Sequence, residues 1–360
     1  MLRNEKEHLE KRPLGVGVIG LGNWSYQLGQ AIRRSPQVNL ISCYTRTVEK
    51  RERYAETFDC AAAATLQELF DTAGLEAVVL TTPAHTHDDL TMACARQGLH
   101  VFVEKPMSLS VPGALRQIAA CRENGVALMV GHEMRRLGSI RAAKQLLQDG
   151  ALGTVVSAVA SMTLRGRFEP DNWRCHRATN RGGALMQLGS HPIENLNYLL
   201  GRPLRVRGAL ANAVAPNNVA DVGSAIISYE GGVEATVSAN YVSPSSQRLS
   251  LYGTRASLHQ VVDMRVWPDA TLVDDRTELW LEDGQDHHQV SIAARDVLVE
   301  QLEDFSTSVR TSTAPETGGE EGLWAVAVVE GAMRSNDSGR AIELDPLIDE
   351  YQEKGTRHES

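Results

Sequence analysis

Four glycines stand within eight residues near the start of the chain, and a turn this rich in glycine can bind a phosphate group. They are Gly15, Gly17, Gly20 and Gly22. The first three match the pattern G-x-G-x-x-G, but this pattern binds pyrophosphate only where a strand ends and a helix begins. The apolar run between residues 15 and 19 predicts a strand. We therefore expect the turn to begin at Gly20 and the first two glycines to be strand residues.

The predicted phosphate loop is Gly20-Leu-Gly22-Asn-Trp-Ser25. Gly20 and Gly22 would hold the pyrophosphate of a dinucleotide. Ser25 stands at the third glycine position of the pattern and is small enough for the close helix–strand packing required there. By itself, the loop is equally compatible with a glycine-rich turn that binds nothing.

The end of the next predicted strand bears on the choice of nucleotide. Sites for NAD place an acidic residue about 20 residues past the loop, where it binds the ribose 2′-hydroxyl. Here the strand ends Cys43-Tyr-Thr-Arg-Thr47, and no carboxylate occurs before Glu49. Thr45 can hydrogen-bond a 2′-phosphate, and Arg46 can pair with it or stack on adenine. We therefore predict NADP rather than NAD as the preferred cofactor, although a solvated arginine after an ordinary strand would give the same sequence.

Two further polar segments follow predicted strands. Glu104-Lys105-Pro106 comes directly after an apolar run, and Leu80-Thr-Thr-Pro83 leads into His87. The carboxyl ends of the strands form the ligand-binding edge of an open α/β sheet, so both segments are expected there. Lysine is most often a solvated surface residue, and a histidine in a turn is often only a polar turn residue. The position of Lys105 at a strand end favours a chemical role.

Residues 14–131 alternate apolar strands with amphipathic helices. Strands are predicted at 15–19, 38–44, 77–80, 100–103 and 126–130. Helices predicted at 87–97 and 112–124 are each followed by a glycine, the usual residue just past a helix end. Alternation of this kind predicts an α/β domain with a doubly wound parallel sheet.

The pattern changes after a helix predicted at 139–149. Strands with period-two alternation are predicted at 154–163, 222–229, 233–241 and 248–252. Glu230-Gly-Gly-Val233 predicts a hairpin between two of them. Further helices are predicted at 184–200, 295–309 and 322–334. The expected organisation is a flexible arm at 1–13, a dinucleotide-binding domain at 14–133, a substrate-binding and oligomerisation domain at 134–348, and a frayed polar tail at 349–360.

The composition limits the class of protein. A length of 360 residues predicts about two domains, at roughly 150 residues each. The net charge of −9 argues against nucleic acid or an anionic membrane as the main partner. No apolar run reaches the ~18 residues that span a bilayer, and residues 1–10 lack the apolar core of a signal peptide. The five scattered cysteines predict reduced thiols in a cytoplasmic protein, and no metal cluster is expected.

Taken together, these segments resemble the Gfo/Idh/MocA oxidoreductases. The first part of the resemblance is the glycine loop, the Thr-Pro turn with His87 four residues after Pro83, and Glu104-Lys105-Pro106. It continues in Gly131-His-Glu-Met-Arg-Arg136, Asp171-Asn-Trp-Arg174, Gly182-Gly-Ala-Leu-Met-Gln-Leu-Gly-Ser-His191 and Ser338-Gly-Arg-Ala-Ile-Glu-Leu344. It therefore covers residues 14–345, nearly the whole chain.

The resemblance implies a Rossmann domain followed by an α+β domain with an open-faced, largely antiparallel mixed sheet. That sheet would carry the substrate site and the contact of a homodimer or homotetramer. The implied reaction is hydride transfer between a nicotinamide and a secondary alcohol or ketone of a sugar, cyclitol or related polyol. The implied catalytic residues are Lys105 and His191. The implied cofactor contacts are Gly20, Gly22, Asn23, Trp24, Thr45, Arg46, Thr82, Pro83, His87, Glu104 and Lys105. The predicted substrate contacts are Gln187, Arg135, Trp173 and Arg174, since an aromatic face beside arginines suits a sugar or an acidic polyol.

Two positions depart from the family pattern. The family often has aspartate four residues before the histidine, where this chain has Gln187. Glutamine supplies no negative charge, so His191 is expected to be less basic than in an aspartate-paired site. Proton transfer would then fall to Lys105, with His191 and Gln187 holding substrate hydroxyls. Pro192 disfavours helical geometry at His191, which predicts a kink or a helix start there.

Other functions stay open at this point. The same fold supports enzymes that oxidise a sugar C3 transiently, eliminate the aglycone and recycle the nucleotide. A sensor that binds dinucleotide without catalysis is a further alternative, although it would need neither Lys105 nor His191. His191 as an ordinary buried histidine, and the arginines as solvated helix residues, are the plain structural alternatives.

Overall fold

The computed structural model describes residues 12–166, 168–266 and 270–356, so most of the predicted N-terminal arm lies outside the described residues. The chain forms two compact units. The first contains the chain up to Met107 together with Arg116–Gly131 and Asp296–Glu320. The second contains Ser108–Leu115, His132–Arg295 and the chain from Glu321 onward.

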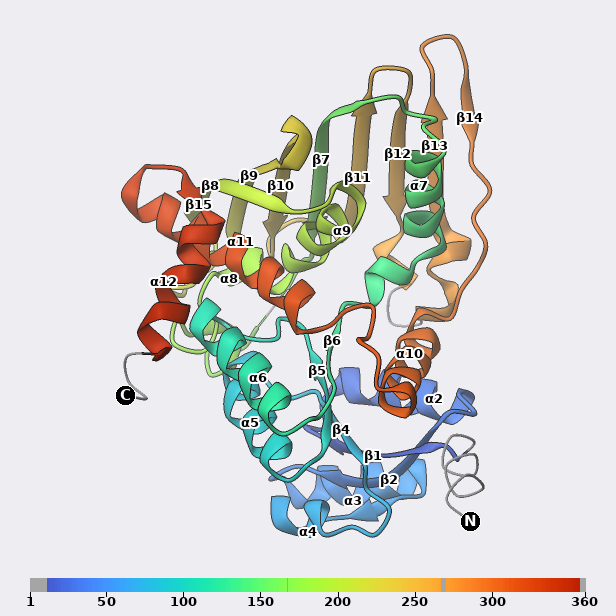
Figure 1. Ribbon diagram of the computed structural model, residues 1–360, viewed down its shortest axis with the longest axis vertical. Helices are drawn as coiled ribbons and strands as arrows, with labels where there is room; N and C mark the ends of the chain where they lie inside the picture. The colour runs from blue at the N-terminus through green and yellow to red at the C-terminus, as the bar shows by residue number, and fades with distance from the viewer. Residues whose placement is uncertain (1–11, 167, 267–269, 357–360) are drawn as a thin grey trace. The chain divides into compact units, whose positions relative to one another are not determined.

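The first unit is built on a six-stranded parallel sheet in the order β3-β2-β1-β4-β5-β6. The strands are β1 (Leu14–Ile19), β2 (Val38–Tyr44), β3 (Ala61–Ala62), β4 (Ala77–Leu80), β5 (His100–Glu104) and β6 (Leu128–Gly131). The helices are α2 (Asn23–Arg34), α3 (Val48–Phe58), α4 (Leu66–Phe70), α5 (His87–Arg96), α6 (Val111–Glu123) and α10 (Val297–Thr311). In Figure 1, α5 and α6 lie on one side of this sheet and α2 and α10 on the other.

The sequence explains why these strands form. Strands β1 and β4 are buried along their whole length, as parallel strands covered by helices on both faces must be. The five strands predicted in this region are present, and their ends move by two residues at most. Gly98 and Gly125 have positive φ angles past α5 and α6, which confirms the predicted helix ends. The strand order is that of a Rossmann fold, with the ligand-binding crevice at the carboxyl ends of β1 and β4.

The second unit is built on a nine-stranded sheet in the order β14-β13-β12-β11-β7-β10-β9-β8-β15. The strands are β7 (Val155–Thr163), β8 (Pro203–Ala211), β9 (Val222–Tyr229), β10 (Glu234–Asn240), β11 (Ser246–Gly253), β12 (Ser257–Val262), β13 (Thr277–Glu282), β14 (His287–Gln289) and β15 (Ile342–Glu343). The pair β7–β10 is parallel and the other pairs are antiparallel, so the sheet is mixed as expected. The predicted hairpin at 230–233 joins β9 to β10.

The helices of this unit are α7 (Gly138–Gln148), α8 (Gly183–Gln187), α9 (Ser190–Leu200), α11 (Gly319–Ser338) and α12 (Leu344–Thr356). Short 3-10 helices in the two units span Ala84–Thr86, Glu133–Arg136, Trp173–Cys175, Glu230–Gly232, Met264–Val266, Ala270–Leu272 and Asp274–Arg276. Helices α7, α8 and α9 pack on one face of the sheet, where Figure 1 shows α7 and α9 in front of the strands. Alternate residues of β9 and β10 are accordingly buried under them.

The helix predicted at 184–200 is broken in two. Helix α8 ends at Gln187 and α9 begins at Ser190, one residue before His191, which confirms the helix start predicted from Pro192. Gly189 forms the junction, and a Cβ atom there would lie 2.5 Å from the Leu185 carbonyl oxygen. The break places Gln187 at the end of one helix and His191 at the start of the next.

The prediction of a frayed tail from residue 349 is wrong for the described part of it, because α12 continues to Thr356. Leu347 and Ile348 are buried, which anchors the helix. The Tyr351 hydroxyl donates a hydrogen bond of 3.1 Å to Glu330, and Arg334 donates one of 2.9 Å to Glu350. Residues 357–360 lie outside the described residues.

Candidate active site

The four glycines near the start of the chain occupy different environments, and the structure explains each one separately. A Cβ atom on Gly15 would lie 2.1 Å from the Gly74 carbonyl oxygen, and one on Gly17 would lie 3.0 Å from Leu75 Cδ1. Both glycines belong to β1, as predicted, and serve the packing of the sheet. Gly20 follows the strand and has a φ of 92°, a backbone angle that residues with a side chain rarely adopt.

Gly22 differs from the other three because no described residue requires a glycine there. Its φ is −86°, and a Cβ atom would meet no described atom within 4 Å. Gly22 caps the N-terminus of α2, which has no side-chain cap and no acidic residue in its first turn. An open backbone at a helix N-terminus is suited to a close-approaching anion, so the loop fits the pyrophosphate of a dinucleotide.

Ser25 confirms the packing expected at the third glycine position. It is fully buried, and its hydroxyl donates a hydrogen bond of 2.6 Å to the Gly22 carbonyl oxygen. The Tyr54 hydroxyl donates one of 3.0 Å to the Ser25 carbonyl oxygen. The turn is thereby fixed from inside the protein, and the outer side of its backbone is left for a ligand.

Glu104 joins the phosphate loop to Lys105. The Trp24 indole Nε1 donates a hydrogen bond of 2.6 Å to Glu104 Oε1, and the Lys105 backbone N–H donates one of 3.2 Å to Oε2. Burial raises the pKa of Glu104 to about 7, while the charge of Lys105 and the two N–H donors act in the opposite direction. The structure thus brings Trp24, Glu104 and Lys105 together at the carboxyl end of β5.

His87 holds the two strand-end turns together. It is almost fully buried; its Nε2 lies 2.9 Å from the Thr82 carbonyl oxygen and its Nδ1 lies 3.0 Å from that of Pro106. Burial lowers the pKa of His87, and the two carbonyl oxygens act against this shift. We therefore propose that His87 fixes these turns rather than contacting the cofactor directly. The same turn also packs on the phosphate loop, because a Cβ on Gly20 would lie 2.6 Å from Thr82 Cγ2.

Arg46 is exposed beyond the end of β2. It has no hydrogen-bond or ion-pair partner in the described part of the chain, whereas the neighbouring Thr45 carbonyl oxygen accepts a hydrogen bond from Arg51 (3.1 Å). Burial lowers the pKa of His85, and the positive charge of Arg46 lowers it further. The charge of Arg46 therefore reaches the turn that follows β4, at the same edge as the phosphate loop.

The second unit holds Gln187, His191 and a carboxylate to which the sequence analysis gave no role. His191 Nδ1 lies 3.9 Å from Glu133 Oε1, and the two side chains are 3% and 1% exposed. The lower basicity expected for His191 considered only position 187, and it stays a prediction. Gln187 is not an acidic neighbour, but Glu133 approaches from another segment. Its position directly after β6, within the Gly131–Arg136 motif, was the signal that could have revealed it.

Arg135 is occupied within the protein. It forms an ion pair with Glu194, with Nε 2.5 Å from Oε1, and its guanidinium lies 4.8 Å from the centre of the Tyr198 ring. Its exposed fraction is 7%. We therefore assign Arg135 to the packing of α9, in place of the substrate contact expected from the sequence.

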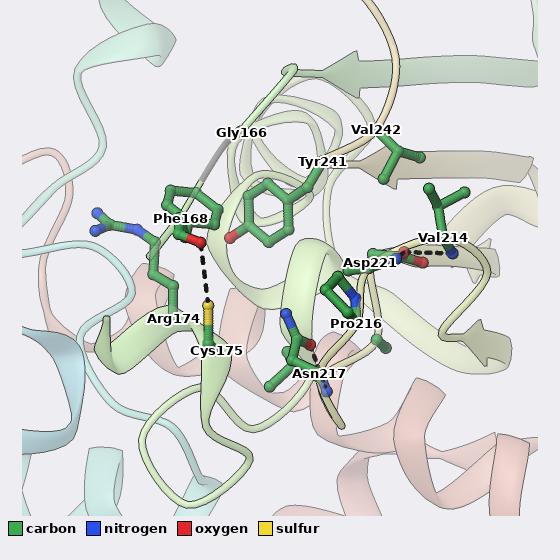
Figure 2. A pocket seen from close by; sticks show the side chains of 13 residues that line it. Gly166, Phe168, Arg174, Cys175, Val214, Pro216, Asn217, Asp221, Tyr241 and Val242 are labelled. Atoms are coloured by element: carbon green, nitrogen blue, oxygen red, sulfur yellow. Dashed lines mark hydrogen bonds between the residues drawn. The ribbon is translucent and has the colours of Figure 1, made fainter. Parts of the chain in front are cut away.

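Trp173 and Arg174 lie in the 3-10 helix 173–175, in the connection between β7 and α8. The Arg174 guanidinium lies 4.3 Å from the Trp173 ring centre and 5.4 Å from that of Phe168. Arg174 also lines a pocket of about 300 Å³ with Phe168, Tyr241 and Pro216 (Figure 2). In that view the guanidinium lies on the side of Phe168 away from Tyr241. Phe168 and Tyr241 form the aromatic side of this pocket, with their ring centres 5.4 Å apart.

Comparison with known proteins adds to this geometry. Residues 14–132 match the model of an oxidoreductase family with an NAD-binding Rossmann fold, and residues 140–259 match the Gfo/Idh/MocA C-terminal domain. The chain belongs to the Gfo/Idh/MocA family. This membership confirms the resemblance found in the sequence and makes the protein an NAD(P)-dependent oxidoreductase of that family.

Individual relatives match over nearly the whole chain. The D-xylose 1-dehydrogenase [NADP(+)] of Haloarcula marismortui is 26% identical over 351 residues, covering 92% of this chain and 94% of its own. A crystal structure described as an NADPH-dependent oxidoreductase of Desulfitobacterium hafniense superposes with a TM-score of 0.90 at 32% identity, covering 93% of this chain and 99% of its own. The aldose-aldose oxidoreductase of Caulobacter crescentus gives a TM-score of 0.84 at 25% identity, covering 92% and 100%.

Two kinds of feature are absent from the described part of the chain. None of its helices combines the length and the apolar character needed to cross a membrane. Its histidine, cysteine and acidic side chains form no group of three or more that could hold a metal ion.

Proposed function

We propose that this protein transfers a hydride between a nicotinamide dinucleotide and a secondary alcohol or ketone of a sugar, cyclitol or related polyol. The observation that carries the proposal is the hydrogen bond from Trp24 to Glu104, because it ties the phosphate loop to the strand end that bears Lys105. The names of the D-xylose dehydrogenase and the aldose-aldose oxidoreductase support a sugar-like substrate.

The chain itself must exchange the hydroxyl proton. When bound, the nicotinamide accepts or supplies the hydride. An alcohol gives up its hydride readily only as its oxygen loses a proton, so a base must lie within hydrogen-bonding distance. We assign that exchange to Lys105, and we assign the binding of substrate hydroxyls to His191 and Gln187. Trp173 and Arg174 would contact a sugar or acidic polyol further from the reacting carbon.

We infer that NADP is the preferred cofactor. Arg46 is exposed at the end of β2 and carries a charge that no described acid neutralises. A guanidinium in that position can bind a 2′-phosphate through two N–H groups.

The outer face of the second sheet supports a homodimer or homotetramer. On β9 and β10 it presents Ser224, Ser228 and Ser238, and it includes Val159 and Ile226, which are 47% and 48% exposed. An exposed sheet face of this kind can pack against a second copy of itself around a twofold axis. Sedimentation velocity would test the oligomeric state.

Substitution of Lys105 tests the reaction. A panel of sugars, inositols and sugar acids is first assayed with NAD and NADP by nicotinamide absorbance. With the best pair, Lys105→Met should lower kcat by at least about 100-fold and leave nucleotide binding intact. Lys50→Met, at an exposed lysine of α3, is the matched control. Nucleotide binding without turnover of any substrate would favour a sensor, and aglycone release without net cofactor reduction would favour the eliminating enzyme.

A further inference from the structure

The start of α9 lies against the 3-10 helix Glu133–Arg136, and this contact brings a carboxylate to His191. The distance of 3.9 Å between His191 Nδ1 and Glu133 Oε1 is too long for a hydrogen bond. It is short enough for a strong charge–charge interaction, because both groups are shielded from water. The carboxylate faces the Nδ1 side of the ring, so Nε2 is directed away from it.

Several other charged or titratable groups pack against α9 or lie next to it. Glu194, on the same helix, is held by Arg135. Arg141 and Lys144 on α7 lie 5.3 and 5.0 Å from the centre of the Tyr198 ring. The remaining charged or titratable groups of the segment preceding α7 are His132 and Arg136, both buried. Helix α8 and strand β7 contain no titratable side chain, and Glu234 of β10 is exposed on the opposite face.

We propose that Glu133 is the positioning residue of His191. Its charge attracts the Nδ1 side of the ring and so turns Nε2 toward the substrate oxygen, and it strengthens the hydrogen bond that Nε2–H donates to that oxygen as the oxygen gains charge in the transition state. Glu133 thereby supplies, from a segment 58 residues away, the negative charge that position 187 lacks. This inference rests on the function proposed above, because it requires a substrate oxygen at His191.

A double-mutant cycle tests the pairing with the full-length protein and the best substrate of the panel. Glu133→Gln keeps the size of the side chain and removes its charge. It should lower kcat by at least about tenfold and change KM by less than about threefold. In a His191→Asn background, the same substitution should change kcat by less than about twofold, because the partner is already gone. Glu133→Asp, which keeps the charge, should retain more kcat than Glu133→Gln.

The control is Glu330→Gln. Glu330 is as deeply buried, but it accepts a hydrogen bond from the Val111 N–H (2.7 Å) and pairs with Arg334 on α11. This variant should lose stability without the drop in kcat. Circular dichroism and thermal melting check that each variant folds, and if Glu133→Gln does not, Glu133→Ala, which also removes the charge, enters the cycle in its place.

Each outcome has a defined meaning. Losses that multiply in the double variant would show that Glu133 acts on another group, and this would overturn the pairing. A rise in KM with unchanged kcat, or an aspartate variant no better than the glutamine variant, would overturn it as well. Absence of turnover in the wild-type protein would refute the proposed function itself, and it is seen before any variant is made.

Discussion

A substitution at Gly22 should weaken cofactor binding while leaving the stability of the protein almost unchanged. Replacing it with valine adds a branched side chain to an extended backbone, with φ −86° and ψ −177°, which valine adopts without strain. No described atom lies within 4 Å of the added Cβ, so the protein itself should not be distorted. The expected loss of unfolding free energy is about 1 kcal/mol or less, the cost of a poorer helix N-cap.

The added side chain occupies the space through which pyrophosphate would approach the N–H groups at the start of α2. We expect the dissociation constant of the nucleotide to rise at least about tenfold, which corresponds to about 1.4 kcal/mol or more. Calorimetric titration with NADP and NAD measures this change without any substrate. Thermal unfolding of the same samples measures the stability.

Gly17→Ala is the matched control, and it should behave in the opposite way. Its Cβ would press on Leu75 and Leu69 at 3.0 and 3.3 Å, so overpacking should cost about 1–3 kcal/mol of stability. Nucleotide affinity should hardly change in this variant, because Gly17 lies within β1. Wild-type nucleotide affinity in Gly22→Val, or an equal loss of affinity in both variants, would refute the prediction that the phosphate-binding loop begins at Gly20.

Two further substitutions test the electrostatics of the first unit. Arg46→Ala should weaken NADP binding by about 10- to 100-fold and leave NAD binding unchanged; a protein that prefers NAD and is indifferent to this change would contradict the NADP assignment. Glu104→Gln should gain stability relative to the wild type as pH rises. The raised pKa of Glu104, about 7 against an ordinary 4.5, stabilises the fold below pH 4.5, and that contribution is lost as pH approaches 7. The relative gain should reach about 3 kcal/mol at most, and a difference in melting temperature that stays constant from pH 5 to 8 would contradict it.

The sequence predicted the sheet of the first unit because of how parallel strands are buried. Each strand covered on both faces must be a short apolar run, and such runs stand out between charged helices. Residues 38–44 and 77–80 were placed with both ends correct. The register of the glycine loop followed from the end of one such strand, since a turn can begin only where the strand stops.

Elements with a weaker pattern were not predicted. Helix α3 has charged residues along most of its length, and its apolar side chains Tyr54 and Phe58 are buried through ring contacts with Tyr26 of α2. Strand β3 has only two residues, Ala61 and Ala62, and is defined by its pairing with β2. Such elements are held by tertiary contacts, so local periodicity cannot reveal them.

What the tertiary structure alone decided is which distant side chains meet. The segment Asp296–Glu320 returns to the first unit, where Arg310 pairs with Glu76 at 2.7 Å, and nothing in the local sequence marks that return. The sequence likewise determined that His191 starts a helix and that position 187 carries no charge. It did not determine that Glu133 replaces the missing carboxylate. Local sequence fixes which groups lie on one element, whereas the packing of a helix start against another segment fixes which groups share a buried site.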